Sequence, residues 1–334
     1  QLFESGSLYM RNKYSFILAA TVAVPVILFT LLTPAPAQAQ GKKWGAGYFP
    51  NVPLITQDGK TVHFYDDVLK GKSVVLDAIY THCVDSCPLE TARLVQVQHM
   101  LGDRVGKDIF FYSITIDPKR DTPKVLKAYS QTYHVGPGWT FLTGKPEDIE
   151  LITKKLGLYS DPDPDDRDGH APGVLIGNEP SHQWMLDAAT DNPRFMSIMI
   201  DQWLTSWKRR QPSMLVSYNK APTTIQKDGR YLFGLHCAAC HTIGHGDKIG
   251  PDLQGVANVR DPRWLARQIA TPDEVLAAKD PIATALWNKY KRVNMPNLRL
   301  DQDEVRLIID FLKDPTKQTQ QDPRSLDLVG AHGH

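Results

Sequence analysis

The stretch SVVLDAIYTHCVDSCP, residues 73 to 88, decides the fold of the first half of the chain. Its hydrophobic run at 73 to 79 is typical of a short buried strand, and apolar residues at helical spacing over 88 to 101 predict a helix directly after it. Cys83 and Cys87 stand between the two elements. The cysteines therefore lie at the carboxyl end of a strand, where open α/β sheets place their sites.

The residues on either side of this stretch continue the alternation of strands and helices. Hydrophobic runs predict buried strands, and Asp121 or Thr122 followed by Pro123 is typical of a helix start. Such an alternation predicts an α/β sheet covered by helices. We expect strands at 109–116, 139–142 and 174–176, and helices from 121 or 122, at 146–156 and at 193–208.

The four cysteines form two pairs, too few for a disulfide-stapled scaffold of 334 residues. The C-x-x-x-C spacing of Cys83 and Cys87 puts both sulfurs on one face of a helical turn, whereas thioredoxin-type redox motifs have two intervening residues. Three interpretations stay open at this point: a structural disulfide, an exchanging dithiol and a pair of metal ligands. Soft thiolates favour Cu(I), and one imidazole would complete a three-coordinate site.

Three motifs extend this pattern: YTHCVDSCP at 80–88, TIDPKRDTP at 115–123 and FLTGKPEDI at 141–149. Together they resemble the Sco copper-chaperone family over roughly residues 45 to 210. The resemblance implies a thioredoxin-like fold and copper bound by Cys83, Cys87 and a later histidine. His170 best matches that position and His182 is the alternative. The client that the resemblance implies is the binuclear copper site of cytochrome oxidase.

The second cysteine pair lies in CAACH, residues 237 to 241, and C-x-x-C-H is the attachment signature of a c-type haem. Thioether bonds from Cys237 and Cys240 would fix the porphyrin, and the adjacent His241 would ligate the iron. Met295 is the best candidate for the opposite ligand. His245 is a poorer one, because it follows the attachment loop too closely to reach the far face of the haem.

Two further segments, GPDL at 250–253 and VNMPNLRLDQDEV at 293–305, resemble class I cytochromes c. The resemblance covers roughly residues 225 to 313 and implies an all-α domain with one covalent haem c. His/Met ligation leaves no open position and suits electron transfer. Asp301 and Glu304 predict a capping box at the start of the last helix.

The N-terminal segment has the order of an export signal. Arg11 and Lys13 precede an apolar run at 16–32 and the small-residue stretch TPAPAQAQ. The run approaches the ~20 residues that span a bilayer, so residues 14–33 are either a signal peptide or a membrane anchor. Both alternatives place the rest of the chain in the periplasm or on the outer face of the cytoplasmic membrane.

We therefore expect a fusion of two globular domains. The formal net charge of +1 gives no reason to expect nucleic acid as a partner. The expected parts are a signal or anchor at 1–40, a Sco-like copper domain at 41–208, a linker at 209–224, a cytochrome c domain at 225–316 and a tail at 317–334.

The expected function couples copper binding and thiol chemistry to haem electron transfer, in copper delivery to cytochrome oxidase or in its maturation. Such a protein is a copper chaperone and electron-transfer protein more than a classical enzyme. Two alternatives are an electron-transfer subunit of a larger respiratory membrane complex and a haem-linked thiol-disulfide oxidoreductase. The expected partners are cytochrome oxidase or another respiratory complex, and periplasmic electron carriers.

Overall fold

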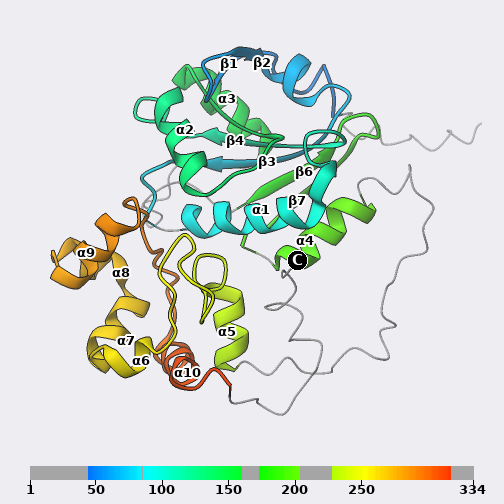
Figure 1. The fold of residues 1–334 in the computed structure, drawn as a ribbon. Helices are drawn as coiled ribbons and strands as arrows, with labels where there is room; N and C mark the ends of the chain where they lie inside the picture. The colour runs from blue at the N-terminus through cyan, green and yellow to red at the C-terminus, as the bar shows by residue number, and fades with distance from the viewer. Residues whose placement is uncertain (1–43, 85, 160–172, 191, 204–227, 317–334) are drawn as a thin grey trace, which may run out of the picture. The chain divides into compact units, whose positions relative to one another are not determined.

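The computed structural model describes residues 44–84, 86–159, 173–190, 192–203 and 228–316. The predicted signal or anchor, the linker, the tail and His170 lie outside these residues. The positions of the chain's parts relative to one another are not determined, so each domain is described by itself (Figure 1). Within the residues that are described, no helix is long and apolar enough to cross a membrane.

A seven-stranded sheet in the order β2-β1-β5-β4-β3-β6-β7 forms the first domain. Its three central strands run parallel, and the outer strands pair antiparallel (Figure 1). The central strands are β3 (Ser73–Ile79), β4 (Ile109–Thr115) and β5 (Trp139–Gly144). The outer strands are β1 (Pro53–Thr56), β2 (Thr61–His63), β6 (Val174–Asn178) and β7 (Gln183–Asp187).

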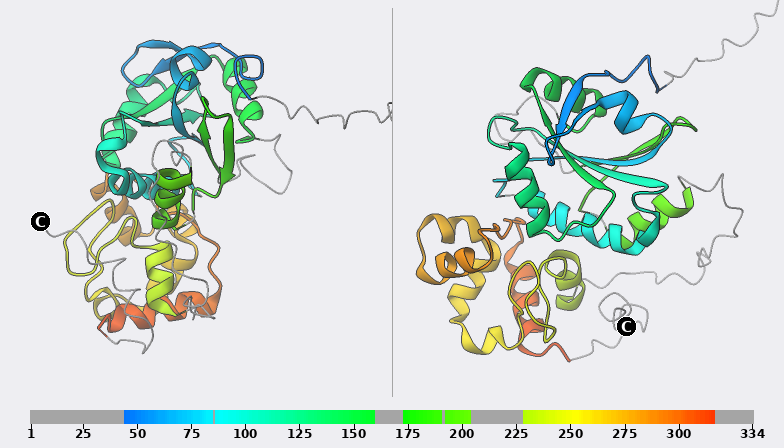
Figure 2. Two further views of the ribbon diagram at one scale, coloured as in Figure 1. Left: turned by 90° about the vertical axis from the view of Figure 1, so that its right-hand side faces the viewer. Right: turned by 45° about the horizontal axis from the view of Figure 1, so that its top comes forward.

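Helices cover both faces of this sheet, as the two further views in Figure 2 also show. Val75 and Ile79 of β3 pack against α1 (Cys87–Leu101), whereas Val74 and Leu76 face the opposite layer. This division follows from the alternation of side chains along a strand. The α1 face also holds α2 (Pro123–Thr132) and α4 (Pro193–Ile198), and the other face holds α3 (Pro146–Leu156) and the π-helical turn η1 (Phe64–Leu69).

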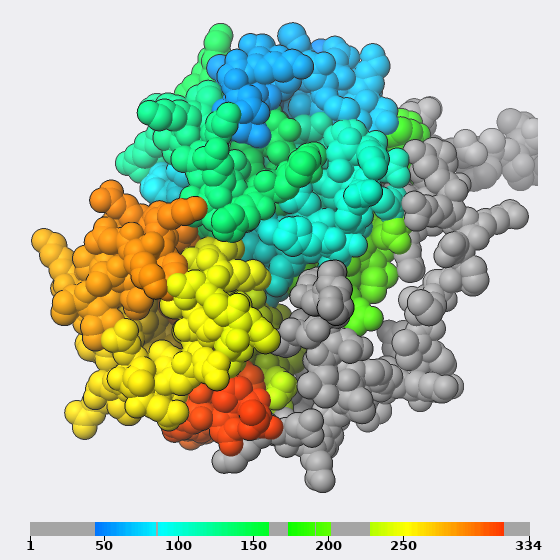
Figure 3. Space-filling view, in the orientation of Figure 1, coloured from blue at the N-terminus to red at the C-terminus, as the bar shows by residue number. Residues whose placement is uncertain are grey.

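The predicted α/β alternation is confirmed, and three short outer strands were not predicted. β1, β2 and β7 have three to five residues each and are only partly buried. They lack the continuous hydrophobic run that marks a central strand. β1 and β2, drawn in blue in Figure 3, lie at the surface of the domain.

The predicted start of α2 is confirmed, because Thr122 is its N-cap and Pro123 its first residue. The Thr122 side chain makes no capping bond, and Asp121 binds elsewhere. The helix expected at 193–208 is α4 followed by the π-helical turn η3 (Met199–Trp203), with later residues outside the description. A short 3-10 helix, η2 (Gly102–Arg104), follows α1.

The second domain is all-α, as predicted. Its first helix begins at Gly229, because Asp228 accepts a bond from the backbone N–H of Tyr231 and caps the helix. The helices are α5 (Gly229–His236), α6 (Val256–Val259), α7 (Pro262–Ala270), α8 (Pro272–Ala277), α9 (Pro281–Lys289) and α10 (Gln302–Lys313).

Close packing of α5 on α10 closes this domain. A Cβ at Gly229 would lie 2.1 Å from the carbonyl oxygen of Leu307, so only glycine permits this approach. The predicted capping box is present, because Asp301 accepts from the Glu304 backbone and the Glu304 side chain accepts from the Asp301 backbone. The capping box therefore fixes the start of α10, whose apolar side packs into the core of the domain.

Candidate functional site

The first candidate site is the dithiol at the end of β3. Cys87 is the first residue of α1, and Cys83 lies in the preceding loop, where its backbone N–H donates to the Tyr80 carbonyl at 3.2 Å. Both side chains are buried, neither cysteine forms a disulfide, and both pack against the Tyr80 side chain. The predicted transition from strand to helix therefore does place two thiols at one end of the sheet.

A buried carboxylate, Asp121, holds the loop that leads into the dithiol. It accepts hydrogen bonds from the Thr81 backbone at 3.1 Å, the Thr81 hydroxyl at 2.5 Å and the Thr115 hydroxyl at 2.6 Å. Asp121 has no exposed surface. The loop carrying Cys83 is thus tied to the end of β4 by three bonds, a role that sequence reasoning missed because the aspartate looked like a helix cap.

The surroundings of the dithiol disfavour thiolate. A hydrogen bond with Cys83, together with burial, raises the pKa of the Cys87 thiol well above its ordinary value. The negative charge of Glu90 acts in the same direction. Tyr133, which is buried, and Tyr129, which is partly buried, lie in the neighbouring α2 region and bring no positive charge. The Cys87 thiol therefore keeps its proton at neutral pH unless a cation enters.

Strand register rules out the alternative histidine. β6 runs antiparallel to β3, with Val174 opposite Asp77 and Asn178 opposite Ser73. His182 follows the far end of β6 and therefore lies a strand length away from the dithiol, roughly 20 Å at ~3.3 Å per residue. Its Nδ1 is 2.8 Å from the Trp44 carbonyl oxygen. His182 as a copper ligand is thus wrong for this site.

The predicted ligand His170 lies outside the described residues. The strand that follows it, β6, begins beside the carboxyl end of β3, on the side of the sheet that carries the cysteines. Among the described side chains, no three histidines, cysteines or acids converge on a metal position. His82, next to Cys83, has its Nε2 2.7 Å from Arg120 Nη1 and 3.7 Å from Asp117 Oδ2.

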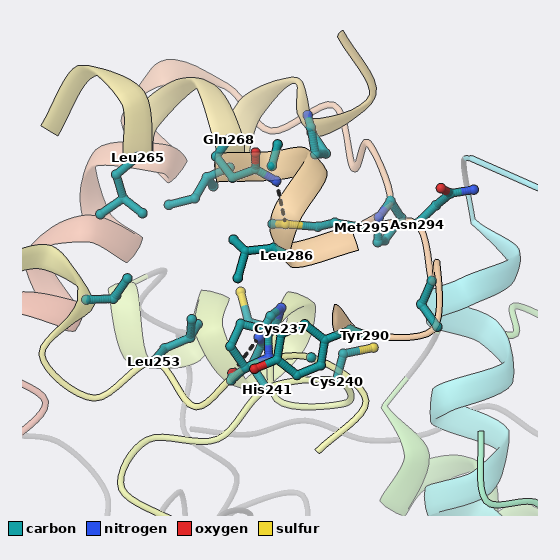
Figure 4. A pocket seen from close by; sticks show the side chains of 18 of the residues that line it. Cys237, Cys240, His241, Leu253, Leu265, Gln268, Leu286, Tyr290, Asn294 and Met295 are labelled. Carbon is teal, nitrogen blue, oxygen red and sulfur yellow. Dashed lines mark hydrogen bonds between the residues drawn. The ribbon is translucent and has the colours of Figure 1, made fainter. Parts of the chain in front are cut away.

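The second candidate site is a cavity of about 530 Å³ in the all-α domain. Its lining is mostly apolar and includes residues of α7, α8 and α9. The CAACH cysteines and histidine lie together on one side, and Met295 lies on the other (Figure 4). Leu286 projects between them. The structure thus brings the four predicted haem residues Cys237, Cys240, His241 and Met295 to one cavity.

The GPDL segment folds back over the attachment loop and orients His241. The Gly250 N–H donates to the Cys240 carbonyl at 2.9 Å, and His241 Nδ1 is 2.9 Å from the Pro251 carbonyl oxygen. This bond fixes a proton on Nδ1 and leaves Nε2 with its lone pair for a metal. Burial lowers the pKa of His241, which keeps the imidazole neutral as iron ligation requires.

Burial raises the pKa of both attachment cysteines, to about 12 for Cys237 and about 11 for Cys240. Both thiols are therefore protonated at neutral pH in the haem-free chain. His245 is exposed in the loop beyond the motif and does not line the cavity. The structure gives it no position from which to ligate iron.

Two side chains support Met295 on the opposite side. The Gln268 amide donates to the Met295 sulfur at 3.5 Å (Figure 4). Trp287 Nε1 donates to the side chain of Asn294, the residue before Met295, at 3.0 Å. His241 packs directly against the backbone of Gly250, which we call the glycine cradle. A Cβ at Gly250 would lie 2.6 Å from the imidazole Cε1, so only glycine leaves room for the ring. An apolar cavity with two thiols, a neutral imidazole and a thioether fits a covalent haem with His/Met ligation.

Sequence reasoning missed the roles of three further residues besides Asp121. Gly250 and Gln268 act through contacts with residues 9 and 27 positions away, which no local pattern reveals. Asp77, by contrast, could have been noticed, since a carboxylate inside the hydrophobic run SVVLDAIY is unusual for a buried strand.

Comparison with known proteins matches a different family to each of the two domains. The SCO1/SenC family model matches residues 46–199, and the Cytochrome c family model matches residues 226–315. An SCO2-like protein of Rickettsia typhi is 32% identical over 142 residues, which cover 42% of this chain and 68% of that protein. Other curated Sco relatives are 34–36% identical, and the chain spans between 30% and 62% of their length.

Two solved structures are also similar to the first domain. ScoI of Bradyrhizobium japonicum with copper bound is 24% identical with a TM-score of 0.39, over 46% of this chain and 99% of that one. BsSco, described as a member of the Sco family of cytochrome c oxidase assembly proteins, is 26% identical with a TM-score of 0.40, over 47% of this chain and 97% of that one.

The SCO1/SenC match, the Sco relative from Rickettsia typhi and the observed sheet topology all concern the first domain. The second match coincides with the helical domain whose cavity carries the C-x-x-C-H residues, and a cytochrome c domain implies a covalent haem c. The chain therefore belongs to the SCO1/SenC family, and joins its thioredoxin-like α/β domain to a cytochrome c domain in one polypeptide.

Proposed function

We propose that this protein couples copper binding in its first domain to one-electron transfer in its second, for delivery of copper to cytochrome oxidase or for its maturation. The copper ligands in this proposal are Cys83, Cys87 and His170. The haem residues are Cys237, Cys240, His241 and Met295. By the export signal or anchor at residues 14–33, the site of action is the periplasm or the outer face of the cytoplasmic membrane.

The observation that carries the copper proposal is the environment of the dithiol. A thiol-disulfide exchange catalyst needs an accessible thiolate of lowered pKa. Cys87 has no exposed surface, and its pKa is raised. A soft monovalent cation removes this obstacle, because its charge compensates the two thiolates that it binds. Metal binding therefore suits these cysteines better than rapid exchange, and copper-bound ScoI offers a precedent among similar chains.

The cytochrome domain supports the redox half of the proposal. Cu(II) bound by two thiolates tends to oxidise them, whereas reduction to Cu(I) by one electron keeps the dithiol intact. The haem, when bound, supplies or accepts one electron at a time. BsSco is described as belonging to a family of cytochrome c oxidase assembly proteins, which makes a copper site of that oxidase the proposed client.

Copper titration of the reduced full-length chain tests the first half. We expect about one Cu(I) per chain, and loss or severe weakening of binding in Cys83→Ser, Cys87→Ser and His170→Ala. His182→Ala is the matched control, since that histidine follows the opposite end of β6 and should leave the affinity unchanged. Retained affinity in His170→Ala would contradict the assignment of the third ligand.

Stopped-flow mixing of Cu(II) with the ferrous, dithiol-reduced protein tests the second half. We expect rapid oxidation of the haem at a rate independent of protein concentration, because donor and acceptor share one chain. The fast phase should disappear in the double variant Cys83→Ser, Cys87→Ser. A haem that stays ferrous, or is oxidised equally fast in the double variant, would favour the alternative of an electron-transfer subunit that passes electrons to an external partner.

A further inference from the structure

Aromatic side chains gather at the start of the first domain. The Trp44 ring stacks on the Trp184 ring with the centroids 5.8 Å apart, and the Tyr48 ring stacks on Trp44 at 4.9 Å. Phe49 contacts all three rings and is 3% exposed, whereas the three rings themselves are only partly buried. Two tryptophans and a tyrosine thus form one continuous surface, and the proposed function does not use it.

The sheet is shaped to receive Trp184. A Cβ at Gly177, its pairing partner on β6, would lie 2.1 Å from Cε3 of the indole, so only glycine lets the ring pack against this strand. Leu186 lies two residues further along β7, on the same face as Trp184, and is 56% exposed. The rings therefore have a fixed place on the sheet, with an exposed apolar side chain beside them.

A lysine completes this surface. Nζ of Lys155, in the last turn of α3, is 5.0 Å from the centroid of the Tyr48 ring, and the Tyr48 hydroxyl donates to the Lys155 carbonyl at 3.1 Å. Lys154 pairs with Glu150, whereas no acid in the described part of the chain forms an ion pair with Lys155. A hollow of about 290 Å³ lies among these side chains. We call the following residues the aromatic patch: Trp44, Tyr48, Lys155, Trp184 and Leu186.

The aromatic patch and the dithiol lie at opposite ends of β3. Trp184 pairs with Gly177, and Gly177 pairs with Val74, the second residue of β3. Cys83 comes after Ile79, the last residue of the strand. At ~3.3 Å per residue, Val74 and Ile79 are roughly 16 Å apart. A surface that covers the aromatic patch therefore leaves the dithiol open to a metal ion or a partner.

We infer that the aromatic patch docks the first domain on the surface of a phospholipid bilayer. This inference rests on the membrane-anchor alternative for residues 14–33 in the proposed function. Ten residues separate that segment from Trp44, and at no more than ~3.6 Å per residue they reach about 36 Å. An anchor holds the aromatic patch at a high effective concentration next to the bilayer, so weak contacts with lipid are sufficient for docking.

The chemistry of the aromatic patch fits the boundary between lipid headgroups and acyl chains. Tryptophan and tyrosine are enriched at that level of a membrane, where their rings have one apolar and one wet side. A lysine there lays its stem along apolar surface and places its ammonium among lipid phosphates. An exposed leucine buries its side chain at the acyl boundary. A protein surface also takes up aromatic residues, but the tether makes the bilayer the surface that this patch meets first.

Photolabelling of the full-length, haem-loaded protein in phospholipid nanodiscs tests the inference. The discs hold one chain each and contain phosphatidylethanolamine, phosphatidylglycerol and a small share of phospholipid with a photoreactive group near its headgroup. We expect mass spectrometry to find labelled residues at 44–49 and 183–187, besides the anchor itself. The double variant Lys155→Glu, Leu186→Glu should lose this labelling several-fold, because it places two negative charges against the lipid phosphates.

Both side chains changed in the double variant are exposed, so it should fold as the wild type does. Val125→Glu is the matched control and should keep the wild-type labelling. Val125 is also an exposed apolar residue, at 38%, but it belongs to α2, on the face of the sheet opposite to the aromatic patch.

Labelling confined to residues 14–33 would overturn the inference and leave the anchor in place, and a chain that does not stay in the discs would overturn both. Shielding of the aromatic patch from radical oxidation only in vesicles with many chains, and not in single-chain discs, would also overturn it and assign the patch to a second copy. Copper titration of the same discs reports on the proposed function separately, since the dithiol lies at the other end of β3.

Discussion

Replacement of Gly250 by alanine should disturb the haem domain through its histidine ligand. The added methyl group would lie 2.6 Å from Cε1, 2.9 Å from Nδ1 and 3.2 Å from Nε2 of His241. Ordinary carbon contacts are ~3.5–4.0 Å, so the overlap is about 1 Å. The Gly250 backbone is held by bonds to Cys240 and Lys248, which leaves the imidazole to move.

Movement of the ring breaks or stretches its 2.9 Å contact with the Pro251 carbonyl oxygen. Loss of that hydrogen bond costs about 1 kcal/mol, and overpacking costs about 1–3 kcal/mol more. We therefore expect the free energy of unfolding of the haem domain to fall by about 2–4 kcal/mol. The reduction potential should rise, because an imidazole without this bond is a weaker donor to ferric iron.

Denaturant titration of the full-length protein, followed by haem absorbance, measures the first effect, and a redox titration measures the second. Gly234→Ala is the matched control, because the space around that glycine of α5 is open and the change should be neutral or stabilising by about 0.5–1 kcal/mol. If Gly250→Ala has the midpoint and the potential of the wild type, the glycine cradle does not set the position of His241.

Three other changes have defined outcomes. Met295→Ala should abolish the sulfur-to-iron absorption band and lower the potential, and an unchanged ferric spectrum would exclude Met295 as the ligand. Asp121→Asn should lower the free energy of unfolding by about 1–3 kcal/mol, since an amide nitrogen cannot accept from Thr81 or Thr115, and it should weaken copper binding in a chelator competition titration. The folded-state pKa values of Asp77 and Glu90 are raised from 3.8 to about 7 and from 4.5 to about 8, so the folded state binds more protons than the unfolded state between these values. Denaturation midpoints of the first domain should therefore fall as the pH rises from about 4 to about 8 and level off above that, and less so in Asp77→Asn with Glu90→Gln.

Local sequence patterns were sufficient for the main elements of both domains. The run at 73–79, the proline-initiated helix at 146–156 and the Asp301 capping box appear in the structure as predicted. Each depends on contacts between residues close in sequence, such as the first-turn bonds of a helix or a continuous apolar strand. The short outer strands were not predictable in this way, because they are stabilised by pairing with distant strands and bury little surface.

The same distinction between local pattern and long-range contact applies to the candidate sites. The sequence by itself determined which residues carry the chemistry, Cys83 and Cys87 by their spacing and Cys237, Cys240 and His241 by their motif, because covalent and coordinative chemistry requires fixed residue types. Only the tertiary structure decided which of the remaining groups surround them. Strand register separates His182 from the dithiol, and among the described residues no cation pairs with the buried Glu90. Burial and charge of this kind depend on contacts that no local pattern encodes.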